Sequence, residues 1–329
     1  ETEDLSDEAT GAKSGSRFGS LGGWLSFLLL LSSIGFGLLF YQRTKKYGKL
    51  KDLYKREKEK SRSDEKLLAQ RDAEKEGYVK KIAAKNVQIY KEKGIKYIVQ
   101  GGEKHETTGH SFSAENNYKS AINLDATRVV SCNTTSILRT LTALKRADLL
   151  DYARGTLLRR ATDPWESHLG GIMNTMVPEK DIPSHQGPDA QTVDSDLDVV
   201  TSAVKVPETL SHMHYWNVKL KRQATKEEVL NALKTSSRIK LIQYDQGLVS
   251  NNTIKEMFLD MGRPWGDMYE VALWEDMLKV QGDELFYAYV VDNQAIVIPE
   301  SIDAIRALTG IDLDAVKSIS KTNESLGIH

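Results

Sequence analysis

The sequence predicts an α/β and α+β protein, in which a globular domain with a large mixed or antiparallel sheet follows one membrane helix and a charged helical stalk. Three observations support this fold class. Residues 21–41 form an uncharged apolar run, residues 42–82 are rich in Lys and Glu, and from about residue 83 strand-like and helix-like segments alternate. With 40% hydrophobic residues and a net charge of −1, most of the 329-residue chain can bury a core, and no nucleic-acid partner is expected.

The N-terminal region predicts a single membrane anchor. An acidic, Gly/Ser-rich tail, residues 1–20, precedes the apolar run at 21–41, which is long enough for a helix to cross a bilayer core of about 30 Å. Trp24 and Tyr41 stand near its ends, where amphipathic rings favour the membrane interface. Basic residues follow the run, so we expect a membrane-anchored protein whose catalytic domain is cytoplasmic. If the segment is not native to the protein, the expected location is the cytoplasm.

A different interpretation of the same run is a dinucleotide-binding turn at Gly35-Phe36-Gly37. Its third glycine position is Phe40, and the preceding apolar run is far too long for a strand. The membrane helix is therefore the favoured interpretation.

The charged region at 42–82 is interpreted as a stalk. Opposite charges four residues apart favour a solvated helix, but the apolar stripe is too sparse for a sustained heptad repeat. The alternative is a disordered charged linker.

From about residue 83 the chain has the pattern of a folded α/β protein. Strands are expected at 95–102, 128–132, 154–160, 200–206, 212–221, 238–244 and 269–274, with a hairpin at 277–291 around Gly282-Asp283. Helices are expected at 84–94, 133–146, 226–236, 252–262, 301–310 and 313–321.

Cys132 is the only cysteine, which excludes an intramolecular disulfide and a cysteine-rich zinc site. It lies where a strand ends and Asn133-Thr134-Thr135 could cap a helix, whose dipole would favour the thiolate. The sequence around it leaves two interpretations open, a nucleophile and a buried structural thiol.

Three further features surround this possibility. His212 and His214 alternate along a strand and should face the same side, although no other ligand cluster supports a metal site, and none is predicted. Arg159-Arg160 and the loop Ser184-His185-Gln186-Gly187 are typical of anion-binding groups. Together these residues suit an enzyme that processes a phosphorylated aldehyde through a thiol.

From about residue 83 to the C-terminus, the sequence resembles the archaeal-type (type II) glyceraldehyde-3-phosphate dehydrogenases. The resembling segments are NVQIYKEKGIKYIVQGGEKH, RVVSCNTTSILRTL, LLRRATDP, IPSHQGPD, the TLSHMH run and IVIPESIDAIRAL, in the family's order and at close to its spacing. The resemblance implies a glyceraldehyde-3-phosphate-dehydrogenase-like catalytic domain that oxidises glyceraldehyde 3-phosphate, with inorganic phosphate as the second substrate and NAD or NADP as cofactor. It also implies a homo-oligomer.

The resemblance assigns roles to individual residues. Cys132 would attack the aldehyde, and His212 would act as base and orient the reacting hydroxyl. The implied substrate-binding residues are Ser131, Asn133, Arg159, His185 and Gln186, and the implied cofactor-binding residues are Gly102, Arg160 and Asn293. Gln186 replaces a common second His of the family, and Asn293 replaces its usual Gln.

The sequence departs from the family at its N-terminal end. There the family has a strand, a Gly-rich turn and the first helices of its NAD(P)-binding domain, whereas this chain has the apolar run and the charged region. Residues 83–131 are therefore interpreted as a remnant of that domain and 132–329 as the catalytic domain, and slow or absent turnover is expected. Three hypotheses follow: a membrane-tethered dehydrogenase, a catalytically impaired membrane-anchored scaffold or interaction protein, and a fusion of unrelated parts.

Overall fold

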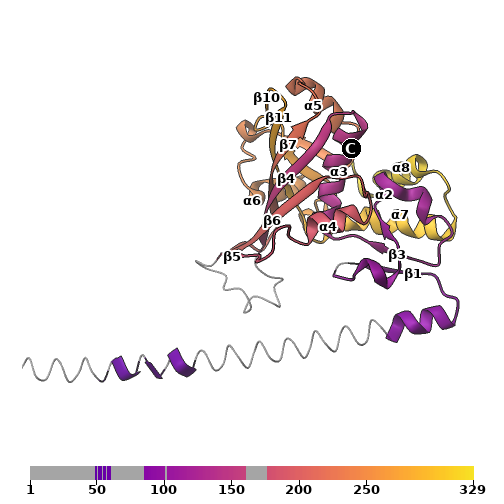
Figure 1. Cartoon of the computed structure of the whole chain (residues 1–329), viewed down its shortest axis with the longest axis horizontal. Helices are drawn as coiled ribbons and strands as arrows, with labels where there is room; N and C mark the ends of the chain where they lie inside the picture. Colours follow the sequence, from indigo (N-terminus) through magenta and orange to yellow (C-terminus); the bar gives the residue numbers. More distant parts are fainter. Residues whose placement is uncertain are drawn as a thin grey trace, which may run out of the picture. The chain divides into compact units, whose positions relative to one another are not determined.

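A computed structural model divides the chain into two units, residues 1–79 and 80–329. It describes residues 49, 51–53, 55, 56, 58–60, 85–100, 102–160 and 176–329. In the first unit, the described residues are helical and exposed. The second unit contains the two sheets and the candidate site (Figure 1).

The predicted membrane-anchored location is corrected by the structure. A helix needs roughly 20 residues to cross a bilayer, and α3 (Cys132–Arg146), the longest helix with described bounds, has 15. In the part of the chain that the structure describes, no helix is long and apolar enough to span a membrane. The apolar run at 21–41 and most of the predicted stalk lie outside the described residues.

The smaller sheet has three parallel strands in the order β1-β3-β2. Residues 85–92 form a helix that leads into it, as predicted. The strands are β1 (Tyr97–Gln100), β2 (Ser111–Phe112) and β3 (Ala126–Val129). Between them lie the short helices η1 (His105–Thr107), α2 (Ala114–Asn117) and η2 (Tyr118–Ala121).

The larger sheet is mixed, as the sequence predicted. Its eight strands run in the order β5-β6-β4-β7-β11-β9-β8, with β10 paired to β11. Strand β4 pairs with β6 and β8 with β9 in parallel, and the other pairs are antiparallel. The strands are β4 (Leu150–Arg160), β5 (Val177–Pro178), β6 (Val199–Val206), β7 (His212–Leu220), β8 (Ile239–Ile242), β9 (Val271–Trp274), β10 (Lys279–Gln281) and β11 (Glu284–Val291).

Helices cover the two faces of this sheet differently, because side chains alternate between the faces of a strand. Along β11, Tyr289 packs in the main core, which includes the buried side chains of α3, whereas Val290 packs in a second core with Phe258 of α6. The remaining helices are α4 (Gln186–Gln191), α5 (Lys226–Leu233), α6 (Asn251–Asp260), α7 (Ile298–Thr309) and α8 (Ala315–Leu326), with η4 (Tyr244–Gln246), η5 (Pro264–Gly266) and η6 (Ala295–Val297) between them.

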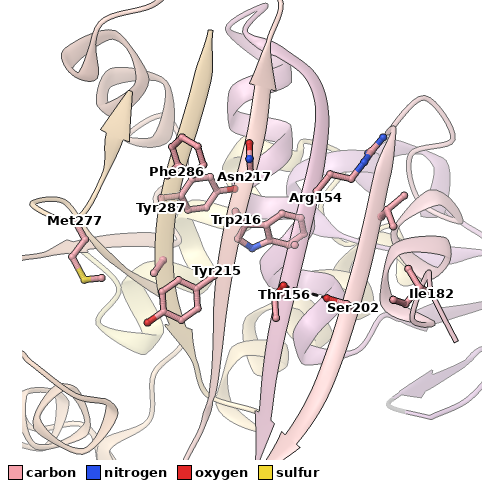
Figure 2. A pocket seen from close by; sticks show the side chains of 13 residues that line it. Arg154, Thr156, Ile182, Ser202, Tyr215, Trp216, Asn217, Met277, Phe286 and Tyr287 are labelled. Carbon is pink, nitrogen blue, oxygen red and sulfur yellow. Dashed lines mark hydrogen bonds between the residues drawn. The ribbon is translucent and has the colours of Figure 1, made fainter. Parts of the chain in front are cut away.

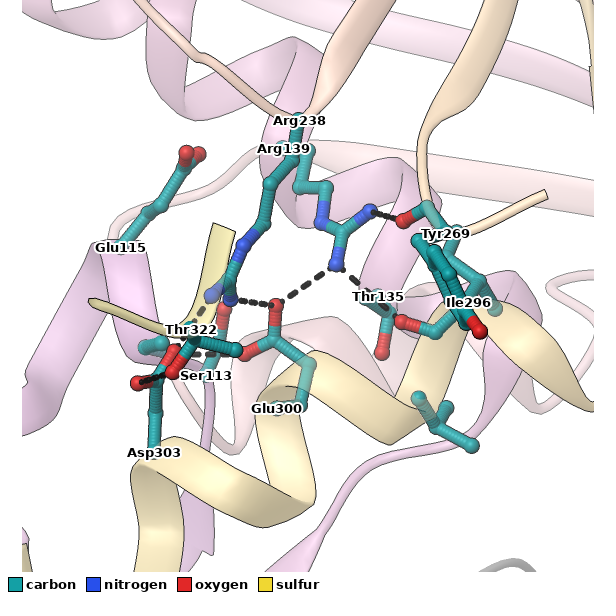
Figure 3. Close-up of polar contacts among 12 residues, drawn as sticks. Ser113, Glu115, Thr135, Arg139, Arg238, Tyr269, Ile296, Glu300, Asp303 and Thr322 are labelled. Carbon is teal, nitrogen blue, oxygen red and sulfur yellow. Dashed lines mark hydrogen bonds and ion pairs between the residues drawn. The ribbon is translucent and has the colours of Figure 1, made fainter. Parts of the chain in front are cut away.

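A buried ionic cluster fixes α3 against the C-terminal helices (Figure 3). Arg139 of α3 and Arg238 both bind Oε1 of Glu300, at 2.8 and 3.0 Å, and Arg238 also pairs with Asp303 at 2.5 Å. All four side chains are fully buried. Burial alone would raise the pKa of Glu300, but the two arginines outweigh it and lower that pKa. Removing one charge would leave the others unpaired in the interior, so the cluster holds α3 in one position.

Candidate active site

A cavity of about 790 Å³ lies at the N-terminus of α3. It collects residues that are far apart in the sequence, and all of the predicted site residues except one line it. They are Gly102, Ser131, Cys132, Asn133, Arg159, Arg160, His185, His212 and Asn293. The structure therefore brings the predicted nucleophile, histidine and anion-binding residues to one place.

Gln186 is the exception. It begins α4 and is fully buried, and it does not line the cavity although its neighbour His185 does. Among the described residues, neither polar atom of its side chain has a hydrogen-bond partner. In this structure the Gln186 side chain therefore does not reach the cavity in which it was predicted to contact substrate.

A second hollow, of about 550 Å³, lies on the large sheet around Trp216 and Tyr215 (Figure 2). Its lining includes Thr156 and Ser202 but no cysteine, histidine or carboxylate. This hollow offers no thiol, and no histidine or carboxylate that could act as acid or base near neutral pH, so the cavity at α3 is the candidate active site.

Cys132 is the first residue of α3 and follows the N-cap Ser131, whose side chain accepts a hydrogen bond from the Thr134 N–H at 3.3 Å. Burial raises the pKa of the Cys132 thiol to about 11. The backbone N–H of Asn133 and the charges of Arg159 and Arg160 oppose this effect without reversing it. The thiolate expected from the sequence is therefore not the resting state at neutral pH, because desolvation outweighs the Asn133 N–H and the two arginine charges.

His212 begins β7, and its ring is held by the end of the neighbouring strand β4. The Arg160 backbone N–H donates a hydrogen bond to Nδ1 of His212 at 3.0 Å. Burial and the charges of Arg159 and Arg160 lower the His212 pKa to about 3, so the ring is neutral. A neutral imidazole that accepts at Nδ1 carries its proton on Nε2, so His212 offers a donor at Nε2.

The anion-binding residues are linked by a carboxylate that the sequence analysis missed. Oε1 of Glu179 lies 3.4 Å from Nη1 of Arg159 and 2.9 Å from Nδ1 of His185. Glu179 therefore occupies a position between the two groups predicted to bind an anion. Glu179 directly follows the short strand β5 and belongs to no motif in the sequence. Its place at the anion-binding residues is set by the pairing of β5 with β6, which the sequence does not show.

A second missed set supports the helix that carries Cys132. Asp189 of α4 forms an ion pair with Arg128 of β3 at 2.7 Å and accepts a hydrogen bond from the Thr134 hydroxyl at 2.7 Å. Both Arg128 and Asp189 line the cavity. Asp189 is the last residue of the resembling segment IPSHQGPD, four residues after His185, and this was the available signal.

The predicted orientation of the two histidines is confirmed. His212 and His214 lie on the buried face of β7, and both side chains are enclosed. His214 does not line the cavity itself, and its ring contacts Asn133, which does, and Tyr289. Among the described residues, no group of three or more His, Cys, Asp or Glu side chains is placed to hold a metal ion.

Comparison with known proteins identifies the family of this site. Residues 131–277 match the glyceraldehyde 3-phosphate dehydrogenase, C-terminal domain. The chain is 41% identical over 248 residues to glyceraldehyde-3-phosphate dehydrogenase 2 of Methanosarcina barkeri, covering 75% of this chain and 73% of the relative. It is 44% identical over 244 residues to the glyceraldehyde-3-phosphate dehydrogenase of Pyrococcus furiosus (74% and 72%), and 45% over 248 residues to that of Metallosphaera sedula (75% and 72%).

The chain belongs to the glyceraldehyde-3-phosphate dehydrogenase family. This confirms the resemblance found in the sequence. The family match begins at Ser131, the residue that caps α3 directly before Cys132.

The dehydrogenases of this family use NAD or NADP, and part of the cavity fits such a cofactor. A Cβ at Gly102 would meet no atom within 4 Å, so the backbone there is open to a ligand. Asn293 and Arg160 line the same cavity and could contact the nicotinamide end. Within the described residues, no Gly-rich turn leads from a strand of the small sheet into a helix of eight or more residues.

Proposed function

We propose that this chain is a phosphorylating glyceraldehyde-3-phosphate dehydrogenase in which Cys132 is the nucleophile. The observation that carries the proposal is the single cavity shared by Cys132, His212, Arg159 and His185. The sulfur would attack the aldehyde carbon of glyceraldehyde 3-phosphate, leaving a negative charge on the former carbonyl oxygen. The thiol proton would pass to solvent, because Nδ1 of His212 is already engaged.

For His212 we propose the role of hydrogen-bond donor, in place of the base expected from the sequence. Its Nε2–H would stabilise the oxyanion that forms when sulfur adds to the aldehyde. NAD or NADP, when bound, supplies the hydride acceptor for the oxidation. Inorganic phosphate would then release the acyl group from Cys132.

Arg159 and His185 are proposed to bind the phosphate of the substrate. Both line the cavity, and both contact the same carboxylate oxygen of Glu179. An anionic phosphate would replace that carboxylate and provide more acceptor oxygens for the same donors. Ser131 and Asn133 are proposed as further substrate contacts, and Gly102, Arg160 and Asn293 as cofactor contacts. Gln186 is also proposed as a substrate contact, and its buried side chain would have to move to reach the cavity.

We further propose that residues 83–131 are the last part of an NAD(P)-binding domain and that 132–329 form the catalytic domain. The three-stranded parallel sheet β1-β3-β2 supports this, because parallel sheets with flanking helices are typical of dinucleotide-binding folds.

We also propose that the chain forms a homo-oligomer. Tyr215 of the large sheet is 46% exposed and lines the hollow in Figure 2. Size-exclusion chromatography with light scattering measures the assembly directly, and a monomer at all concentrations would contradict this proposal.

The enzymatic proposal is tested with the purified intact chain, glyceraldehyde 3-phosphate, inorganic phosphate and either NAD or NADP. Reduced cofactor should form, slowly if the pyrophosphate is weakly held, and the Cys132→Ser variant should form none. Mass spectrometry of Cys132 after alkylation gives a second measurement, because bound aldehyde should protect the thiol. Absence of both turnover and protection would refute the proposal.

A further inference from the structure

The side chain of Asn133 is held at its oxygen by His214. Nε2 of His214 lies 2.8 Å from Oδ1 of Asn133, and both side chains are buried. An amide oxygen can only accept a hydrogen bond, so Nε2 must carry the proton in this contact. Nε2 carries that proton in a neutral and in a charged ring alike, so the orientation of the amide does not depend on the ionisation of His214.

The imidazole that holds this amide is itself fixed from the other side. His214 lies on β7, inside the large sheet, directly opposite Tyr289 of the neighbouring strand β11. Nδ1 of His214 lies 2.8 Å from the Tyr289 hydroxyl, and the centroids of the two rings are 4.9 Å apart. Because the ring has a polar contact at each nitrogen, it cannot turn over without losing both, so it is a rigid support for Asn133.

The amide nitrogen of Asn133 is the end of this side chain that remains available. Asn133 lines the cavity beside Cys132. In the described part of the chain, Nδ2 of Asn133 has no hydrogen-bond partner, but unlike the two polar atoms of Gln186 it is not enclosed by protein. The side chain therefore offers its two amide protons to a molecule in the cavity.

The group of the substrate nearest to these protons is the oxygen on the reacting carbon. Asn133 directly follows Cys132, and its backbone N–H interacts with the sulfur. When the sulfur bonds to the aldehyde carbon, the former carbonyl oxygen stands on the same carbon as the sulfur. The substrate phosphate lies at the far end of the molecule, where Arg159 and His185 are assigned to it.

An oxyanion is stabilised best by donors that are fixed before its charge forms. Nε2 of His212, on β7, is the donor already assigned to it. Nδ2 of Asn133 provides a second donor from a different element, the first turn of α3. His212 and Asn133 line the same cavity as Cys132, so both donors are on the side of the nucleophile.

We propose that the side-chain NH₂ of Asn133 is a catalytic hydrogen-bond donor to the oxyanion on the carbon attacked by Cys132, and that His214 is the positioning residue that keeps this NH₂ toward the cavity. The inference deepens the proposed function and rests on it for the substrate. As the sulfur–carbon bond forms, the second electron pair of the carbonyl bond moves to oxygen, the thiol proton passes to solvent, and Asn133 keeps its protons.

The first test locates the proton on His214 by long-range ¹H–¹⁵N NMR correlation in the intact chain, with a His214→Gln variant for assignment. Nε2 should carry a proton at neutral pH. A bare Nε2 would overturn the proposal, because the amide of Asn133 would then have to present its NH₂ to His214 rather than to the cavity.

The second test compares two reactions of Cys132 that need no cofactor. p-Nitrophenyl acetate acylates a thiol through a tetrahedral oxyanion, whereas iodoacetamide alkylates it at a saturated carbon and forms no oxyanion. Release of p-nitrophenol and the mass of the intact chain give the two rates. Both reactions require the thiolate, so their ratio cancels any change in the thiolate fraction and reports the stabilisation of the oxyanion.

Asn133→Ala should lower the ratio of acylation to alkylation about 10-fold to 100-fold, because a hydrogen bond to a charged oxygen is lost. Asn133→Asp suits the first turn of a helix but removes the donor, so it should lower the ratio at least as far. Thr192→Ala is the matched control and should leave the ratio unchanged, because Thr192 also lines the cavity but its hydroxyl contacts Arg128. Thermal unfolding shows whether each variant remains folded.

His214→Phe removes the support of the amide and should lower the same ratio about threefold to tenfold. His214→Gln keeps an N–H that can face the amide oxygen, so it should restore part of the loss. An unchanged ratio in Asn133→Ala, or an equal fall in Thr192→Ala, contradicts the inference, as does a chain that p-nitrophenyl acetate does not acylate. If Cys132 is acylated but glyceraldehyde 3-phosphate is not turned over, the proposed function fails and the ratio still decides the role of Asn133.

Discussion

Alkylation of Cys132 across pH tests the electrostatics of the site most directly. Burial raises its pKa from the ordinary value of 9.0 to about 11. Because only the thiolate reacts and each unit is a factor of ten, the folded chain should hold about 100-fold less thiolate than an ordinary cysteine below about pH 9. At about pH 7, roughly one thiol in ten thousand is ionised.

The assay is the rate of iodoacetamide labelling of the intact chain, followed by mass. Cys132 is the only cysteine, so each added group reports this site, and Cys132→Ser gives the background. The rate should rise about tenfold per pH unit up to about pH 10, whereas the same chain unfolded in urea should level off earlier. Arg159→Met should move the whole curve to higher pH, because the charge of Arg159 lowers this pKa.

A labelling rate that levels off below about pH 8 would refute this reasoning. It would mean that the start of α3 stabilises the thiolate more than burial destabilises it. The expectation from the sequence, that Cys132 is more reactive than an ordinary cysteine, would then be correct.

Three substitutions test other parts of the structure. Glu300→Gln leaves two buried arginines poorly neutralised and should lower the free energy of unfolding by about 3–5 kcal/mol in urea denaturation; an unchanged midpoint would argue against the cluster in Figure 3. Gly155→Ala places a Cβ 2.6 Å from the ring of Trp216 and should cost about 1–3 kcal/mol by thermal unfolding, which a neutral result would contradict. Glu179→Gln removes the carboxylate at the anion site and should strengthen protection of Cys132 by inorganic phosphate about threefold to tenfold, whereas weaker protection would reverse the assigned role.

Local patterns predicted most elements of residues 83–329. The alternation in HMHYWNVKLK produced β7, and the helical spacing after Cys132 produced α3, which begins one residue earlier than predicted. The strand predicted to end at Cys132 ends at Val129, because Ser131 caps the helix and the chain leaves the sheet first. Strand order was not predictable, since the pairing of β4 with both β6 and β7 joins segments distant in the sequence.

The location of the protein was the clearest error of the sequence analysis. Hydropathy measures only whether a run is apolar and long enough, and 21–41 satisfies both conditions. The described part of the chain provides no helix that could span a membrane.

The sequence by itself determined the family and many of the residues that line the cavity, because motifs such as VVSCNTT and IPSHQGPD are recognisable from the order of their residues alone. Only the tertiary structure decided their chemical states. Whether Cys132 is a thiol, and which nitrogen of His212 carries its proton, depend on desolvation and on a backbone N–H of another strand. Desolvation and hydrogen bonds between strands depend on which atoms are close together in the folded chain, and the order of residues in the sequence does not show this.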